Sequence, residues 1–144
     1  MAEVIDKYQI VRYISKLLPE ARDRVWIVSP YIKLPDFLNL DLDNPKYEKI
    51  RVDIVCGKHR IDAGPYNYFS GRNNVHLHFC KKLHSKIYMN DQYGIICSMN
   101  LYDYSIRNNI ETGVYFSKFD QLYEQCRRKM NGIWTEAIPY TNHL

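Results

Sequence analysis

The chain has 144 residues, of which 46% are hydrophobic and 25% are charged. This composition is typical of one globular domain over residues 1–144 with a single core, and it excludes a disordered chain. No apolar run approaches the roughly 20 residues of a membrane helix, and the first residues lack the apolar stretch of a secretory signal, so we expect a cytoplasmic protein. The net charge of +4 permits a phosphate-bearing partner without requiring one.

The cysteines and histidines predict neither a metal site nor a disulfide framework. The cysteines are far apart and form no C-x-x-C pair: Cys56, Cys80, Cys97 and Cys126. We expect free thiols, because a chain of this size can be stabilised by burial alone. His76 and His78 have the spacing of a metal-binding pair, but the alternating apolar residues of this segment favour a half-buried strand with its polar face outward.

The first half of the chain predicts one helix and two inner strands. An apolar stripe with a 3.6-residue period over residues 5–18 predicts an amphipathic helix. Short apolar runs at residues 25–28 and 50–56 predict buried strands. The segment between them, residues 34–44, is punctuated by prolines and is expected to hold only a short helix or an ordered loop.

The second half predicts closely spaced strands and a closing helix. The strands are expected over residues 75–79, 83–89, 93–98 and 110–116. The turn at residues 90–92 is short, so at least two of these strands should form a hairpin. Residues 119–134 place their apolar side chains on one helix face. The order of elements predicts an α/β fold in which a mixed β-sheet is flanked by helices.

The clearest chemical signal lies in the strand predicted over residues 83–89. Residues two apart on a strand point to the same face, so His84 and Lys86 should project together. Ser98 and Asn100 repeat this spacing at the end of the next strand. The group suits a phosphodiester, because lysine supplies a charge for a non-bridging oxygen, serine and asparagine supply neutral donors, and histidine supplies a nucleophilic or proton-transferring nitrogen.

These residues resemble the HKD motif of the phospholipase D superfamily, H-x-K-x4-D followed by G-S-x-N and a downstream N-x-E. The residues at its functional positions are His84, Lys86, Asp91, Ser98, Asn100 and Glu111. The runs VWIVSPYI and IRVDIVCG and the closing helix that ends in GIWTEA also resemble the family's flanking strands and terminal helix. The resemblance therefore covers nearly the whole chain, and it implies a phospholipase D-like α/β sandwich with one HKD motif per chain.

The chain departs from the family pattern at two points. Cys97 stands where the family usually has glycine before the serine, and the gap from Asp91 to Ser98 is one residue shorter. A tighter hairpin at residues 90–92 would account for the missing residue and keep the strand faces in register.

The resemblance implies a metal-independent phosphodiesterase without a cofactor, which works through a covalent phosphohistidine. His84 would attack phosphorus, and Glu111 would hold the imidazole in the required tautomer and orientation. A second histidine must protonate the leaving oxygen. Because the chain holds one copy of the motif, the resemblance implies a two-fold homodimer with a shared site.

Nucleic acid is the favoured substrate, with DNA ahead of RNA. The chain is basic, is rich in tyrosine and arginine, and shows no device for stable association with a membrane. Candidate substrate contacts are Tyr102 and Arg107, just after the serine and asparagine, and Tyr68 and Arg72, in a segment typical of base-stacking loops. A loop folded over the core is the alternative for that segment.

Short basic runs at residues 58–60, 81–82 and 127–129 are either phosphate contacts or ordinary solvated surface. Two other functions stay open. One is a phospholipase or cardiolipin-type phosphodiesterase, and the other is a non-catalytic subunit that binds nucleic acid.

Overall fold

The computed structural model describes residues 1–57 and 61–141 of the chain. Its strands are β1 (Glu3–Asp6), β2 (Arg24–Val28), β3 (Ile32–Lys33), β4 (Arg51–Cys56), β5 (Val75–Phe79), β6 (Ile87–Asn90), β7 (Tyr93–Cys97), β8 (Leu101–Tyr102), β9 (Thr112–Ser117) and β10 (Ile138–Pro139). Its helices are α1 (Lys7–Ser15), α2 (Leu17–Glu20), α3 (Ala63–Phe69), α4 (Asp103–Asn108) and α5 (Gln121–Glu136), with a 3-10 turn, η1 (Pro45–Tyr47).

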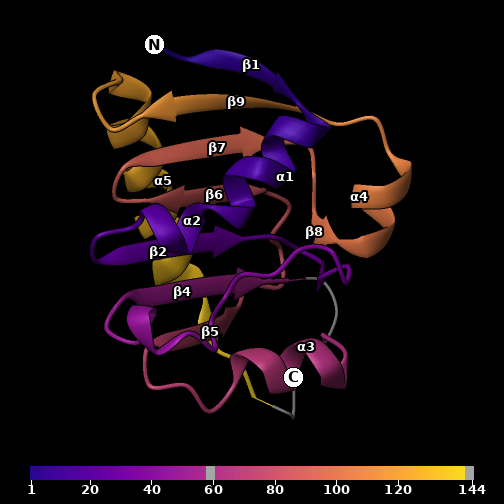
Figure 1. Ribbon diagram of the computed structural model, residues 1–144. Coiled ribbons are helices and arrows are strands. Elements are labelled where there is room, and N and C mark those ends of the chain that lie inside the picture. Colours follow the sequence, from indigo (N-terminus) through magenta and orange to yellow (C-terminus); the bar gives the residue numbers. More distant parts are fainter. Residues whose placement is uncertain (58–60, 142–144) are drawn as a thin grey trace.

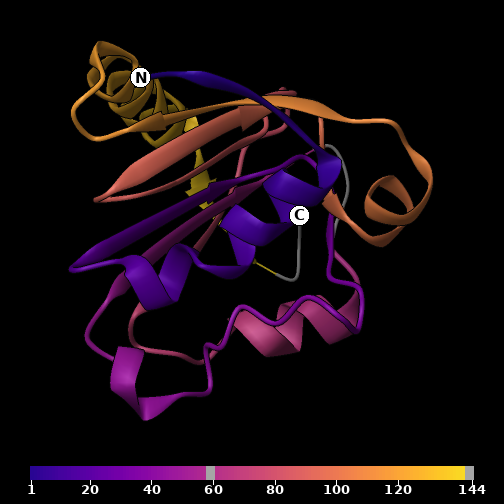
Figure 2. The same cartoon turned by 45° about the horizontal axis from the view of Figure 1, so that its top comes forward.

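Over the described residues, eight strands form one mixed sheet in the order β1-β9-β7-β6-β2-β4-β5-β10, and β3 pairs with β8 (Figure 1). The central strands β2, β4 and β5 run parallel, and the other neighbours are antiparallel. α1 and α2 lie on one face of the sheet and α5 on the other (Figures 1 and 2). This arrangement confirms the predicted α/β fold with a mixed sheet flanked by helices.

Both faces of β2 and β4 are buried, which explains the continuous apolar runs of these two strands. On β2, Val25 and Ile27 join the core cluster beneath α1 and α2, while Trp26 and Val28 join a second cluster beneath α5. The same alternation on β4 divides its apolar residues between the two clusters. The predicted inner strands are therefore confirmed, and they form the rigid centre of the sheet.

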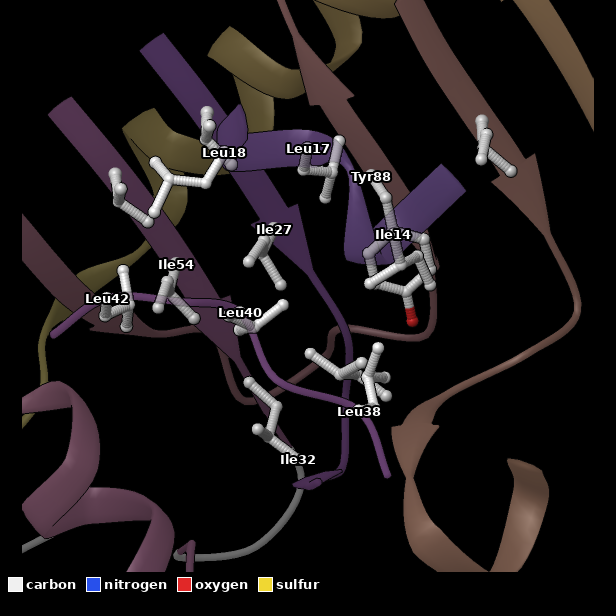
Figure 3. Packing of buried hydrophobic residues seen from close by; sticks show 14 of the residues in the cluster. Ile14, Leu17, Leu18, Ile27, Ile32, Leu38, Leu40, Leu42, Ile54 and Tyr88 are labelled. Carbon is white, nitrogen blue, oxygen red and sulfur yellow. The ribbon is translucent and has the colours of Figure 1, made fainter. Parts of the chain in front are cut away.

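The segment 34–44 is an ordered loop, one of the two alternatives predicted for it. Three of its residues, Leu38, Leu40 and Leu42, are at most 8% exposed. They pack beside Ile27 and Ile54 on the α1 side of the sheet (Figure 3). Burial of alternate leucines fixes this loop over the core without a helix.

The predicted hairpin is confirmed as the pair β6 and β7. The side-chain oxygen of Asn90 accepts hydrogen bonds from the backbone N–H groups of Gln92, at 2.8 Å, and Tyr93, at 2.9 Å. Its amide nitrogen donates to the carbonyl of Leu17 at 2.9 Å. The fully buried Asn90 therefore closes a very short turn and ties it to α2.

The helix predicted over residues 5–18 is interrupted. Residues 3–6 form an edge strand that pairs with β9 instead. A capping box then begins α1: the Asp6 carboxylate accepts the Gln9 N–H, and the Gln9 side-chain oxygen accepts the Asp6 N–H, both at 2.9 Å. A second break at Lys16 separates α1 from α2. Pairing with a distant strand overrides the helical periodicity of the first residues.

The sequence does not predict the short helices α3 and α4. α3 occupies most of the segment around Tyr68 that was expected to be a base-stacking loop or a loop folded over the core. Each is anchored by a buried side chain, Phe69 in α3 and Ile106 in α4. Helices this short are marginal alone and form because tertiary packing holds them. The strand and helix predicted at residues 110–116 and 119–134 are confirmed as β9 and α5, both shifted by two residues or less at either end.

Candidate active site

All the predicted catalytic residues except Asp91 lie at neighbouring strand ends, along one edge of the sheet that runs across β6, β7 and β9. His84 and Lys86 precede β6, Ser98 and Asn100 follow β7, and Glu111 precedes β9. Because β7 is antiparallel to both β6 and β9, the start of β6, the end of β7 and the start of β9 lie side by side (Figure 1). The fold therefore gathers residues that span 28 positions of sequence.

Backbone hydrogen bonds hold this edge together beyond the ends of the strands. The Cys97 N–H donates to the Lys86 carbonyl at 3.2 Å, and the Ser98 N–H donates to the Thr112 carbonyl at 3.0 Å. These bonds fix the segment of Lys86 against the end of β7, and the end of β7 against the start of β9. The side chains are thus carried by backbone that is already ordered.

His84 and Lys86 form the outer part of the site. The prediction of a strand through residues 83–86 is wrong, because this segment is irregular and β6 begins only at Ile87. The two side chains still project together: Lys86 Nζ lies 3.4 Å from His84 Nε2. His84 is exposed and Lys86 is half-buried. An imidazole nitrogen and an ammonium group are therefore accessible at one point of the surface.

The exposed Ser98 and the buried Glu111 form a second, hydrogen-bonded part of the site. Glu111 is only 7% exposed, and its carboxylate accepts a short hydrogen bond from the Ser98 hydroxyl. The Ser98 hydroxyl also accepts the Thr112 N–H at 3.1 Å. A buried carboxylate needs such a partner, and the serine bridges it to the backbone of β9.

Asn100 completes the group from the turn after β7. Its side-chain amide oxygen is buried and makes no hydrogen bond to any residue in the ranges that the structure describes. An unpaired buried polar atom is costly in a folded protein and often marks a functional position.

Cys97, which replaces the family's glycine, is accommodated by a glycine on the neighbouring strand. Its thiol packs against the core cluster and donates weakly to the Met99 carbonyl, with sulfur and oxygen 3.6 Å apart. A Cβ atom on Gly113 would lie only 2.9 Å from the Cys97 Cβ. Burial raises the pKa of the Cys97 thiol to about 12, so the thiol stays protonated and acts as an apolar side chain.

Two buried hydroxyl groups, which sequence reasoning missed, fix the turn between β7 and β8. The Tyr88 hydroxyl donates to the Met99 carbonyl at 2.7 Å, and burial raises the pKa of this fully buried phenol well above its usual range. The Ser29 hydroxyl donates to the Tyr31 carbonyl at 2.7 Å and accepts the Leu101 N–H at 2.9 Å. A tyrosine within the apolar run of β6 was the available signal, because a buried phenol needs a partner.

Asp91 does not join this group. It follows β6 at the opposite end from His84, and its carboxylate accepts the backbone N–H groups of Arg22, Asp23 and Arg24 at 2.8, 2.5 and 3.0 Å. Partial burial alone would raise the pKa of Asp91, but these hydrogen bonds outweigh it and lower the pKa below its usual value. The structure places Asp91 where it anchors the start of β2.

The four candidate substrate contacts fall into two places. Tyr102 lies on β8, with its ring centroid 6.0 Å from that of Tyr31. Arg107, on α4, pairs with Asp103 at 2.5 Å, and its guanidinium carbon lies 5.1 Å from the centroid of the Phe37 ring. Both belong to elements that directly follow Asn100.

Tyr68 and Arg72 lie at the other place, on and just after α3. Arg72 pairs with Asp43 at 2.5 Å and donates to the Tyr68 carbonyl at 2.7 Å. The Tyr68 hydroxyl contacts the Leu42 N–H at 3.3 Å. The segment is largely helical rather than the expected loop, and it packs on the loop 34–44, while the role of Tyr68 and Arg72 in base stacking stays a prediction.

The histidines of β5 lie on the predicted strand, but the predicted outward polar face holds for His76, which is exposed, and not for His78, whose Nδ1 atom is buried. The His78 ring stacks on Trp134 of α5, with centroids 3.8 Å apart, and burial lowers the pKa of His78. Within residues 1–57 and 61–141, no three His, Cys, Asp or Glu side chains cluster as metal ligands would, and all four cysteines are free thiols. The basic run at residues 58–60 lies outside the described residues.

Comparison with known proteins identifies the family and the fold. A family model described as "Cardiolipin synthase, PLD-like domain" matches residues 14–134, so the chain belongs to this family of phospholipase D-like proteins. The sequence matches no curated protein at a significant level. None of the helices in the described part of the chain has the length and apolar composition needed to cross a membrane.

Solved structures with the same fold include NucT from Helicobacter pylori, with a TM-score of 0.81, 12% identity, and coverage of 97% of this chain and 99% of that one. Nuc from Salmonella typhimurium, described as a phospholipase D family member, has a TM-score of 0.79, 16% identity, and 99% coverage of both chains. The archaeal chromatin protein TrmBL2 has a TM-score of 0.67 and 16% identity, with 97% and 55% coverage.

Proposed function

We propose that this chain is a metal-independent nuclease that hydrolyses phosphodiester bonds of nucleic acid, DNA ahead of RNA. The observation that carries the proposal is the approach of Lys86 Nζ to within 3.4 Å of His84 Nε2, beside the hydrogen-bonded pair of Ser98 and Glu111. This arrangement offers a nucleophile, a cation for the phosphate oxygens and a buried carboxylate within one small region. Nucleic acid is favoured by the basic charge and by similarity to a chromatin protein whose structure is described as showing a mode of DNA binding.

In the proposed reaction, Nε2 of His84 attacks phosphorus in line with the leaving oxygen. The N–P bond forms as the P–O bond breaks, and a second histidine gives its proton to the leaving oxygen. That histidine, now a base, then removes a proton from water, and the water oxygen displaces His84 from phosphorus. Lys86 stabilises charge on the non-bridging oxygens throughout, and the Asn100 amide is a further donor for them.

The second histidine comes from a second copy of the chain, which makes the active unit a homodimer. Exposed apolar side chains adjoin the site and support this arrangement. Ile110, directly before Glu111, is fully exposed, and Val4 and Ile96 are 77% and 44% exposed. The register of β1, β9 and β7 places Val4 and Ile96 on either side of Val114, on one face. A second copy docked here would cover these side chains and bring two His84 imidazoles together.

The experiment that tests the proposal is cleavage of labelled single-stranded DNA, duplex DNA and RNA in excess EDTA. We expect wild-type cleavage to survive EDTA, and His84→Ala to reduce it by about a thousandfold or more while it retains DNA binding. His76→Ala, which removes an exposed histidine on β5, is the matched control and should cleave normally. Equal cleavage by His84→Ala and His76→Ala would refute the mechanism.

A phosphodiesterase that acts on phosphatidyl groups is the second candidate, because the matching family model is described as a cardiolipin synthase domain. It would use the same histidine on a lipid headgroup. Release of headgroup from cardiolipin-containing vesicles, with no cleavage of any nucleic acid under the same conditions, would favour this candidate. A failure of both assays would leave a non-catalytic subunit that binds nucleic acid.

A further inference from the structure

We propose that a cavity between the loop 34–44 and α3 binds a nucleobase of the substrate strand. The cavity has a volume of about 390 Å³. The lining residues that carry the argument are Lys33, Asp36, Asn39, Gly64, Pro65 and Tyr68. The proposal rests on the proposed function, because it assigns the cavity to the same nucleic acid that is cleaved at His84. It adds a subsite that the HKD motif does not contain.

The cavity is joined to the catalytic edge through the small sheet of β3 and β8. Lys33 pairs in register with Tyr102 on β8, and β8 begins directly after Asn100. The Ser29 hydroxyl bonded to the Leu101 N–H fastens the start of β8 to the end of β2. After β3 the chain turns along α3, as Figure 2 shows. One pair of short strands therefore joins the turn that carries Asn100 to the wall of the cavity at Lys33.

The lining fits a nucleobase better than a phosphate. Leu34, Leu38 and Pro65 supply apolar surface, and Tyr68 supplies an aromatic ring. Such surfaces accept the flat face of a base. The polar edge of a base can form hydrogen bonds with the side-chain amide of Asn39. A phosphate group inside the cavity would be repelled by the carboxylate of Asp36, which also lines it. The volume is in the range of small-molecule sites, about 300–1,000 Å³.

Charge at the mouth of the cavity fits the phosphate that accompanies the base. The charged residues of the lining are Lys33 and Asp36, and both are exposed. Lys33 is the one of the two that can attract a phosphate. It lies on β3, in register with Tyr102 of β8. In the proposed complex the scissile phosphate lies at Lys86, another phosphate of the same strand lies near Lys33, and its base enters the cavity.

The cavity wall is ordered before a ligand binds. The Tyr68 hydroxyl lies 3.4 Å from the Asn39 side-chain oxygen, and that oxygen also accepts the Asp41 N–H at 2.8 Å. The Arg72 guanidinium lies 5.1 Å from the centroid of the Tyr68 ring and pairs with Asp43. These contacts fix α3 and the residues that follow it against the loop 34–44. A preformed pocket lowers the entropic cost of binding.

Gly64 allows a direct test, because a Cβ atom at this position would meet nothing within 4 Å. Gly64→Phe should therefore fill the cavity without displacing the backbone, and Gly64→Leu provides a second, smaller filler. Gly132→Phe is the matched control: Gly132 also has open space around its Cβ position, but it lies in α5 on the other face of the sheet. Thermal denaturation identifies any variant that fails to fold.

The measurement is fluorescence titration with single-stranded hexadeoxynucleotides in which one 2-aminopurine is moved along the strand. All proteins carry His84→Ala so that no strand is cut. We expect the fluorescence to change at one position of the strand. Filling the cavity through Gly64 should abolish that change and weaken binding about tenfold, a typical contribution of one stacked base, while Gly132→Phe should behave as the parent.

The proposal is overturned if no position of 2-aminopurine responds, or if both fillers at Gly64 bind like the Gly132→Phe control. Cleavage by the protein with His84 intact, measured separately in EDTA, reports on the proposed function. Cleavage without a position-specific response rejects the base pocket alone. A position-specific response without cleavage rejects the nuclease and leaves a site that binds single strands.

Discussion

At the scale of single residues, the HKD pattern combines two kinds of side chain that the sequence alone does not distinguish. Lys86 Nζ and His84 Nε2 lie 3.4 Å apart, so the two side chains project together as predicted, although their segment is not the predicted strand. Asp91 belongs to the same pattern, yet it lies at the far end of β6 and binds backbone N–H groups. The spacing could show that these residues act in one motif. It could not show which of them reaches the substrate, because that depends on where β6 begins and ends.

Asp91→Asn should reduce stability without reducing the rate of the chemical step. Three backbone N–H groups bond to the carboxylate, and replacing it with an amide should cost about 1–3 kcal/mol at pH 7. We expect kcat to stay within about twofold of wild type, because Asp91 is remote from the reacting atoms. Asp62→Asn, at an exposed carboxylate that makes no capping bond to α3, is the control for both measurements.

The same residue predicts a pH dependence of stability. The pKa of Asp91 is held below its ordinary value of 3.8 in the folded chain, so the unfolded chain binds the proton more tightly. The stabilisation is therefore complete above the unfolded pKa and is lost as the pH falls through the folded pKa. Melting temperatures below about pH 4 should fall more steeply for wild type than for Asp91→Asn. Parallel curves would show that the carboxylate has no such role.

At the scale of elements, the sequence predicts the strands that carry their own apolar pattern and misses those fixed by distant contacts. The runs at residues 25–28 and 50–56 are confirmed, because both faces of these strands are buried. The sequence predicts a helix that begins at residue 5, within β1. It misses β1 because this strand is fixed by pairing with β9, about 110 positions away. The sequence does not predict α3 either, because this helix has no clear periodicity of its own. It is stabilised by the buried Phe69 and by contacts with the loop 34–44.

The turn between β7 and β8 should depend on the hydroxyl of Tyr88. Tyr88→Phe removes the donor to the Met99 carbonyl and should cost about 1 kcal/mol of stability. Because this turn carries Asn100, we also expect kcat to fall about tenfold through misplacement of the amide. Tyr93→Phe is a close control: its buried hydroxyl donates to the Tyr13 carbonyl at 2.6 Å, but it lies at the opposite end of β7.

Comparison of the two tyrosine variants separates stability from catalysis. Both should lower the melting temperature, and only the variant at Tyr88 should lower kcat. Equal kcat values for the two variants would mean that the buried hydroxyl supports the core without positioning the site.

At the scale of the whole molecule, the proposed mechanism requires two chains. Ile110 is fully exposed beside Glu111, so a charge placed there should disrupt docking of a second copy while it leaves the fold of each chain intact. We expect Ile110→Asp to halve the mass measured by light scattering and to reduce cleavage by at least about a hundredfold, because each site then lacks its second histidine. Ile138→Asp, on the 51% exposed Ile138 of β10, should change neither property.

A wild-type protein that is monomeric and fully active would contradict the shared site. So would an Ile110→Asp variant that is monomeric yet cleaves at the wild-type rate, since one chain would then supply both histidines.

The most direct test of the central claim is detection of the covalent intermediate. Wild type is mixed with oligonucleotide in EDTA, quenched in alkali to preserve a phosphoramidate, digested, and analysed by mass spectrometry. We expect a nucleotidyl adduct on His84 that appears during turnover and disappears when substrate is exhausted. Turnover that proceeds while the His84 peptide stays unmodified at every time point would contradict the central claim.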